Sequence, residues 1–194
     1  MPILLRRRQR QKALEKSIAE DDVHVVEQAL RQGKLTPDMV NAEGNSAIHS
    51  AARRGAAAVL ELLISENIGA IDARRPSDGG TPLMYAAQNG HPNCLEQLLE
   101  AGAVINLQQA EGSAAVHYAC RHGHTACLEL LLAAKGCDAS VARGDGITAL
   151  MVAANFGQAG CIDLLLQRAK GVNLAQRSAA DLSALDYACK AGHA

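Results

Sequence analysis

The chain has 194 residues, a formal net charge of −1 and 48% hydrophobic residues, but only 2% aromatic residues and no tryptophan. A charge this close to zero gives no overall bias toward nucleic acids or anionic membranes, and no apolar run approaches the length that spans a bilayer. The start, MPILLRRRQRQK, has no secretory h-region, so we expect an intracellular protein, placed in the cytoplasm with the nucleus left open as a second compartment.

The first forty residues differ from the rest of the chain. Residues 1–12 form a basic arm, which is either a frayed or weakly helical terminus or a binding element for an import receptor or an acidic surface. Residues 13–40 form a degenerate unit in which Asp21 stands at a position that is glycine in later units. Its outer side carries more charge than theirs, as a capping repeat requires, so we expect an N-terminal cap.

The stretch 79–106 contains the clearest helical hairpin. Thr81 is a candidate N-cap, and Pro82 follows it at the first helical position. Gly90 and Gly102 are the expected ends of the two helices. Residues spaced i, i+3 and i+4 share a helix face, which predicts these inner positions: Leu83, Ala86 and Ala87, then Cys94, Leu95, Leu98 and Leu99. Neither helix can bury its apolar stripe alone, so the unit must stack on others.

The same hairpin recurs along the chain. Equivalents of Thr81 follow at intervals of 33 to 35 residues, namely Ser46, Ala114, Thr148 and Ser183. A period near 33 residues with a helix start of the Thr-Pro-Leu-His-x-Ala type is typical of ankyrin repeats, and the chain resembles that family over residues 41–194. The resemblance implies an all-α fold, an ankyrin-type repeat solenoid of stacked helix-turn-helix units with β-turn fingers.

Four full repeats are expected over residues 41–175, and a partial fifth repeat over 176–194. The fifth supplies a first helix and no second helix before Ala194. Two functions remain open on this basis. The chain is a non-catalytic scaffold or adaptor for a partner protein, or it is the regulatory ankyrin segment of a larger multidomain enzyme such as a kinase or ubiquitin ligase.

The cysteines follow the repeat. Cys94, Cys127 and Cys161 occupy one repeat position, and equivalent residues of neighbouring repeats lie about one helix-packing distance apart, ~8–10 Å. That distance is too long for a disulfide, so we expect small buried hydrophobic side chains. Cys137, in a connecting segment, is the expected reactive thiol.

Catalytic and metal sites find little support. In the family that the chain resembles, His49 and His117 occupy a position that supports the turns through hydrogen bonds. A cluster of His122, His124 and Cys127 has the look of a zinc site, but it straddles a helix end and lacks a fourth ligand. No phosphate-binding loop follows a strand, and no serine lies in a nucleophile elbow. We therefore expect no enzyme activity, no metal and no cofactor.

Helix register identifies the surface expected to bind a partner. Residues opposite the buried face of each first helix should line the concave groove that ankyrin proteins present to partners, with finger residues at its border. Tyr and Arg are favoured anchors at protein interfaces. The candidate partner-binding residues are Arg53, Arg54, Tyr85, Gln88, Asn89, Tyr118, Arg121, His122, Asn155 and Phe156 on the helices, and Arg75 and Arg143 on the fingers.

The charge of this groove predicts the kind of partner. Its helix positions carry arginines without acidic residues, whereas the second helices carry an outward acidic ladder of Glu27, Glu61, Glu96, Glu129 and Asp163. A basic groove with aromatic side chains favours a protein partner with acidic and apolar anchor residues. We expect no nucleic-acid partner, because the basic groove alternates with fingers that carry Asp and Glu, and no membrane partner. The oligomeric state stays open.

Overall fold

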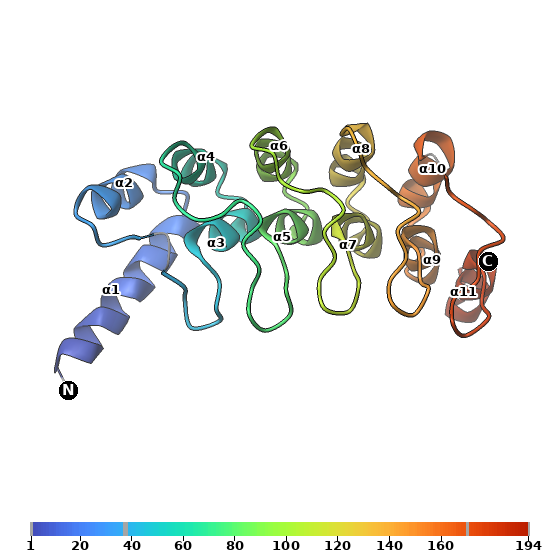
Figure 1. Ribbon diagram of the computed structural model, residues 1–194, viewed down its shortest axis with the longest axis horizontal. Helices are drawn as coiled ribbons and strands as arrows, with labels where there is room; N and C mark the ends of the chain where they lie inside the picture. Colours follow the sequence, from blue (N-terminus) through green and yellow to red (C-terminus); the bar gives the residue numbers. More distant parts are fainter. Residues whose placement is uncertain (1, 37–38, 170, 194) are drawn as a thin grey trace.

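The computed structural model describes residues 2–36, 39–169 and 171–193, and in this part of the chain helices stack into an elongated solenoid without a β-sheet. Figure 1 shows two rows of helices. One row holds the second helix of each unit: α2 (Val23–Arg31), α4 (Ala57–Ser65), α6 (Pro92–Glu100), α8 (Thr125–Ala133) and α10 (Ala159–Arg168). The other holds the first helices: α3 (Ala47–Arg54), α5 (Pro82–Asn89), α7 (Ala115–His122), α9 (Ala149–Asn155) and α11 (Ala184–Ala191). The all-α repeat solenoid is therefore confirmed.

Helix α1 (Pro2–Ala19) precedes these rows and projects away from them on the side of the fingers (Figure 1). It passes without a break from residue 12 to residue 13, so the basic cluster and the first helix of the cap form one continuous helix. None of the helices in residues 2–36, 39–169 and 171–193 is both long and apolar enough to cross a bilayer.

Each first helix in the repeats begins at the position that the spacing predicts. The side chain of Thr81 accepts a hydrogen bond from the backbone nitrogen of Met84 at 3.4 Å, which satisfies one of the free N–H groups at the helix start. Ala114 has no hydroxyl, and there Nδ1 of His117 accepts the N–H of Ala114 at 3.2 Å. The helix N-caps are Ser46, Thr81, Ala114, Thr148 and Ser183.

The end of α5 shows how neighbouring repeats lock together. Gly90 adopts a φ of 71°, a left-handed conformation that costs glycine little. The imidazole of His124 lies directly on it, so a Cβ at Gly90 would come within 2.6 Å of that ring. Nε2 of His124 also bonds the carbonyl oxygen of Gln88 at 3.2 Å. Glycine therefore ends the helix and leaves room for the next repeat, as at Gly55 beside His91 and Gly123 beside Gln158.

The core runs between the two rows. Leu83, Ala86 and Ala87 are at most 1% exposed, as predicted, and full burial of a leucine side chain is worth about 1.5–3 kcal/mol. The predicted positions on α6 are buried too, except that Leu99 is only partly buried. The core positions of the second helices form one ladder through the solenoid: Val59, Cys94, Cys127 and Cys161.

All six cysteines are free, and the surroundings of Cys137 do not favour the reactivity expected of it. Burial raises the pKa of the Cys137 thiol to about 11, which disfavours the reactive thiolate at neutral pH. Cys137 lies in a connecting segment, as expected from the sequence, but it is partly buried against the core. Cys189 on α11 is the exposed cysteine.

The fingers are held against one another by backbone hydrogen bonds. The nitrogen of Ala110 donates to the carbonyl oxygen of Asp78 at 2.9 Å, and the nitrogen of Ala179 donates to that of Asp145 at 2.8 Å. Buried His49 reaches the next finger, where its Nε2 lies 2.9 Å from the carbonyl oxygen of Ala73. These contacts fix the finger side chains beside the first helices, as the family resemblance implied for His49.

Candidate functional site

The candidate residues lie where the first helices meet the fingers. On α5 every residue from Pro82 to Ala87 is buried, because α3, α6 and α7 pack around that helix. Only its last turn, with Gln88 and Asn89, reaches the surface. On α5, exposure on the concave side is thus confined to the end of the helix, so fewer of its residues are available to a partner than helix register alone predicts.

A hollow of ≈ 210 Å³ opens between the second finger and the ends of α3, α5 and α7. We call it the Tyr85 hollow. It brings together six of the predicted residues from three repeats, along with Asp78, Gly80 and Met84: Arg53, Arg75, Tyr85, Gln88, Asn89 and Tyr118. The sequence placed these residues on one face, and the fold shapes that face into a concave, mostly polar site.

Tyr85 lies deeper than expected. Its side chain was predicted to line the surface of the groove, but the residue is only 7% exposed. The Arg75 guanidinium lies over its ring at 5.3 Å from the centroid, and His49 meets it edge-on at 5.8 Å. Its hydroxyl has no hydrogen-bond partner among the residues that the structure describes. Burial, followed by the nearby Asp78 carboxylate, raises the pKa of Tyr85 to about 12, so the hydroxyl stays a proton donor.

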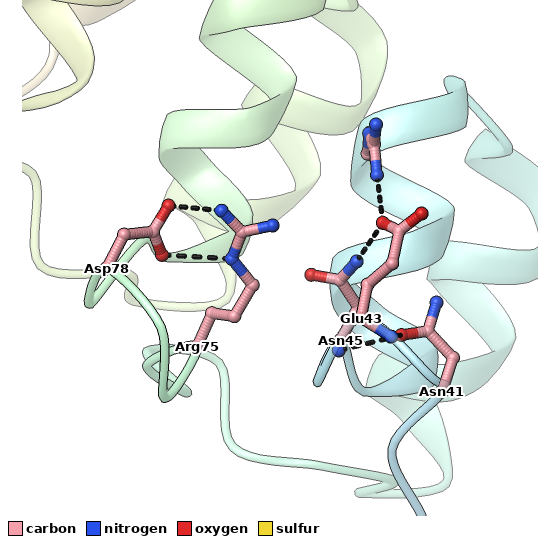
Figure 2. A network of polar contacts seen from close by, with 6 residues as sticks. Asn41, Glu43, Asn45, Arg75 and Asp78 are labelled. Atoms are coloured by element: carbon pink, nitrogen blue, oxygen red, sulfur yellow. Dashed lines mark hydrogen bonds and ion pairs between the residues drawn. The ribbon is translucent and has the colours of Figure 1, made fainter.

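Finger carboxylates neutralise several of the predicted arginines. Arg53 on α3 pairs with Glu43 of the first finger at 2.5 Å, and Arg143 pairs with Asp145 at 3.2 Å. Figure 2 shows the bidentate pair of Arg75 and Asp78, formed within the second finger. This pairing lowers the pKa of the Asp78 carboxyl. The expectation of a basic groove therefore holds for the helices only, because the fingers bring acidic side chains against them.

These carboxylates share one sequence position that helix register does not reveal. Each stands three residues before the N-cap of a first helix, and the set is Glu43, Asp78, Glu111 and Asp145. In the first finger, Asn41 accepts the N–H of Asn45 at 3.0 Å and Asn45 donates to Glu43 at 3.1 Å (Figure 2). The regular spacing of these carboxylates is visible in the sequence, but the pairing of Glu43 with Arg53 is not.

Farther along the same side, Phe156 and Arg121 form a second feature. Phe156 ends α9 and is 43% exposed, at a position where earlier repeats carry polar side chains. The guanidinium of Arg121 lies over its ring, 5.1 Å from the centroid, a cation–π arrangement. His122 and Arg54 are exposed and Asn155 is partly exposed. These residues lie outside the Tyr85 hollow, so the candidates form two neighbouring groups.

The histidine and cysteine cluster does not converge. The rings of His122 and His124 stack at 6.0 Å, but Cys127 is fully buried in the core. Nε2 of His124 is already bonded to the carbonyl oxygen of Gln88. Within residues 2–36, 39–169 and 171–193 no group of three or more His, Cys, Asp or Glu side chains is placed to hold a metal ion.

Sequence comparisons agree with this architecture. A family described as ankyrin repeats (3 copies) matches residues 14–109 and 116–194, and one described as ankyrin repeats (many copies) matches residues 94–132. The chain is 50% identical over 60 residues to human ankyrin repeat domain-containing protein 29. It is 42% identical over 65 residues to the protein of that name from Danio rerio.

A third relative is the E3 ubiquitin-protein ligase KEG of Arabidopsis thaliana, with 38% identity over 66 residues. The match to the human protein covers 30% of this chain and 19% of that protein. The match to the Danio rerio protein covers 33% of this chain and 21% of that protein. The match to KEG covers 32% of this chain and 4% of KEG. The matched segment therefore spans about a fifth or less of each relative's length.

Proposed function

The chain belongs to the ankyrin-repeat family, and we propose that it is a non-catalytic protein-interaction module. Its concave groove and fingers hold a segment of a partner protein that carries acidic and apolar anchor residues. Ankyrin-repeat domains are in general non-catalytic binding scaffolds, and the same scaffold serves unrelated partners. The function of this chain must therefore be argued from its own surface.

The single observation that carries the proposal is the exposed Phe156 beneath the Arg121 guanidinium. A phenylalanine that is 43% exposed contributes little to folding, whereas aromatic and arginine side chains dominate the energy of protein interfaces. The guanidinium of Arg121 lies 5.1 Å from the ring centroid, and a contact of this kind favours one orientation of the arginine before binding, which lowers the entropy cost of association. An apolar side chain of the partner would pack on Phe156, and an acidic one would pair with Arg121.

The test compares variants of the two faces of the solenoid. The partner captured from lysate by the wild-type protein is purified, and its affinity is measured for Phe156→Ala, Arg121→Glu and the convex-face control Glu96→Lys on α6. We expect each groove variant to bind ~10-fold or more weakly, and the control to bind like wild type. Circular dichroism checks that all variants remain folded. Wild-type affinity in both groove variants would overturn the assignment of this face.

A second candidate function is regulation within a larger enzyme. It is supported by the similarity to a segment of the E3 ubiquitin-protein ligase KEG, of which 4% is matched. In that case the groove would bind a substrate or an inhibitory segment of the same enzyme. Sequencing the full transcript distinguishes the two, since a catalytic domain in the same reading frame favours regulation and a transcript without one favours the adaptor.

We also propose a cytoplasmic location, with the nucleus as a second compartment. The proposal of a nuclear location rests on the basic cluster of α1, since import receptors bind segments rich in Lys and Arg. A fluorescent fusion in which Arg6, Arg7, Arg8 and Arg10 are replaced by glutamine should lose any nuclear signal that the wild-type fusion shows. An unchanged distribution would remove the import role of the cluster.

A further inference from the structure

The Tyr85 hollow contains hydrogen-bond donors that no described residue uses. A guanidinium carries five N–H donors. Arg75 uses Nε and one terminal nitrogen on Asp78, and Arg53 uses one terminal nitrogen on Glu43, which leaves donors on both groups. Asp78, the one carboxylate in the lining, already accepts from Arg75 and from the backbone nitrogen of Gly80 at 3.0 Å. The two guanidinium groups can therefore donate to an acceptor group of a ligand in the hollow.

The buried hydroxyl of Tyr85 is a second and independent sign. The residue is 93% buried on the wall of the hollow, and its hydroxyl has no partner in the described part of the chain. Leaving a buried hydroxyl unpaired costs about 1–3 kcal/mol, so an unpaired one in a native fold suggests a partner that arrives with a ligand. Gly80 lies against this hydroxyl, and a Cβ there would stand 3.1 Å from its oxygen.

Charge distinguishes between the possible acceptors. The ionised side chains that line the hollow are Arg53, Arg75 and Asp78, and Glu43 pairs with Arg53 from beside it, so these two arginines and two carboxylates sum to no net charge. A carboxylate brings a single negative charge to the unused guanidinium donors. A dianionic phosphoryl group would bring two negative charges beside Asp78 and near Glu43, and like charges at this range repel. A carboxylate therefore fits the site better than a phosphoryl group.

We propose that the Tyr85 hollow receives the carboxylate of an aspartate or glutamate side chain of the partner protein, with Arg53, Arg75 and the Tyr85 hydroxyl as donors. This inference rests on the proposed function, because it names the anchor that the groove recognises and the repeats that recognise it. The neighbouring Phe156 group then takes the apolar anchor. The groove then contacts two side chains at separate positions of one bound segment, which restricts the partner sequences that can bind.

The experiment uses random peptides displayed on phage and selected on the whole wild-type protein. The tightest peptide is synthesised with its acidic residue, with the corresponding amide, and with phosphoserine at that place, and the affinities are measured by fluorescence anisotropy. We expect the amide peptide to bind the wild-type protein ~10-fold to 100-fold more weakly, as for loss of a charge-assisted hydrogen bond. A phosphoserine peptide that binds more tightly than the carboxylate would overturn the choice of anchor.

Protein variants locate the effect. The preference for carboxylate over amide should shrink to near unity in Arg53→Gln and fall in Tyr85→Phe. It should persist in Arg74→Gln, a matched control that loses the same charge from the residue before Arg75 on the second finger, outside the hollow. Tyr85→Phe should keep or raise the wild-type melting temperature, since the substitution removes an unpaired buried hydroxyl and no described hydrogen bond. An equal loss of the preference in Arg74→Gln would show a general charge effect and overturn the site.

Failure of this inference and failure of the proposed function give different results. Selected peptides that depend on Phe156 and Arg121 but show no preference for carboxylate would leave the groove in place and remove the anchor site. Peptides that bind Phe156→Ala and Arg121→Glu as tightly as wild type would remove the groove itself.

Discussion

The buried histidines show how single residues connect the repeats. His117 is 2% exposed. Its Nδ1 accepts the N–H of Ala114, and its Nε2 lies 3.3 Å from the carbonyl oxygen of Ile147 in the next finger. Because Nδ1 accepts, Nε2 carries the proton of a neutral ring. Desolvation by burial lowers the pKa of His117 to about 4. The ring is therefore neutral in the fold at pH values where a free histidine would be charged.

This burial predicts a loss of stability in acid. In the unfolded chain His117 binds a proton near its usual pKa of 6.5, whereas the folded chain resists protonation down to about 4. The free energy of unfolding should therefore fall as the pH drops from 6.5 to 4, by up to ~3 kcal/mol from this residue. His117→Met, which copies Met84 and Met151 at the same repeat position, should flatten that decline in urea unfolding. An identical decline in the variant would contradict this origin.

At the scale of one element, α4 is capped by a residue from the preceding unit. Its own N-cap, Ala56, has no side-chain acceptor. Instead the carboxylate of Asp21 accepts the backbone N–H of Val59 at 2.8 Å and of Ala58 at 3.2 Å. Asp21 also adopts a left-handed φ of 55°, which explains why the later units carry glycine there. The cap unit is thus joined to the first full repeat by a charged side chain at a helix start.

Two substitutions at Asp21 separate these roles. Asp21→Gly keeps the left-handed backbone and removes the acceptor, so we expect a loss of ~1 kcal/mol in the free energy of unfolding. Asp21→Asn keeps an acceptor oxygen and tolerates the same backbone, so it should lose less than half as much. Urea unfolding measures both. Equal stability of Asp21→Gly and wild type would show that the contact between Asp21 and the start of α4 does not stabilise the fold.

Over the whole molecule, burial falls at the C-terminal end of the array. Leu185 on α11 is 71% exposed, although it is the repeat equivalent of Leu83 and Leu150, which are 1% and 5% exposed. In a solenoid each unit is stabilised by its neighbours. The described residues pack α11 against α9 on one side only, so stability is concentrated in the central repeats that carry the Tyr85 hollow.

The same substitution at equivalent positions should therefore have unequal effects. Leu83→Ala leaves a cavity between packed repeats and should cost about 2–5 kcal/mol. Leu185→Ala removes an exposed side chain and should change the free energy of unfolding by no more than about 0.5 kcal/mol. Urea unfolding of the two variants makes the comparison. A similar cost at both positions would mean that the outer side of α11 is covered in solution.

Part of the candidate site followed from the sequence. Helix register placed Gln88, Asn89 and Phe156 on the accessible side, because a helical period depends only on neighbouring residues. Register failed for Tyr85, which points the same way but is covered by Arg75 of its own finger. It also missed the pair of Arg53 and Glu43, since that contact joins a helix to a finger.

The sequence by itself determined the repeat, its helix starts at residues such as Thr81 and its core at residues such as Leu95, because N-caps, glycine ends and apolar spacing are local properties. Only the tertiary structure decided which outward residues stay exposed, which arginines are paired and where the surface is hollow. Those properties depend on fingers and helices of adjacent repeats, and a pattern within one repeat does not encode how closely its neighbours approach. The fold of each unit therefore follows from the sequence of that unit, whereas the binding surface forms only where neighbouring units pack together.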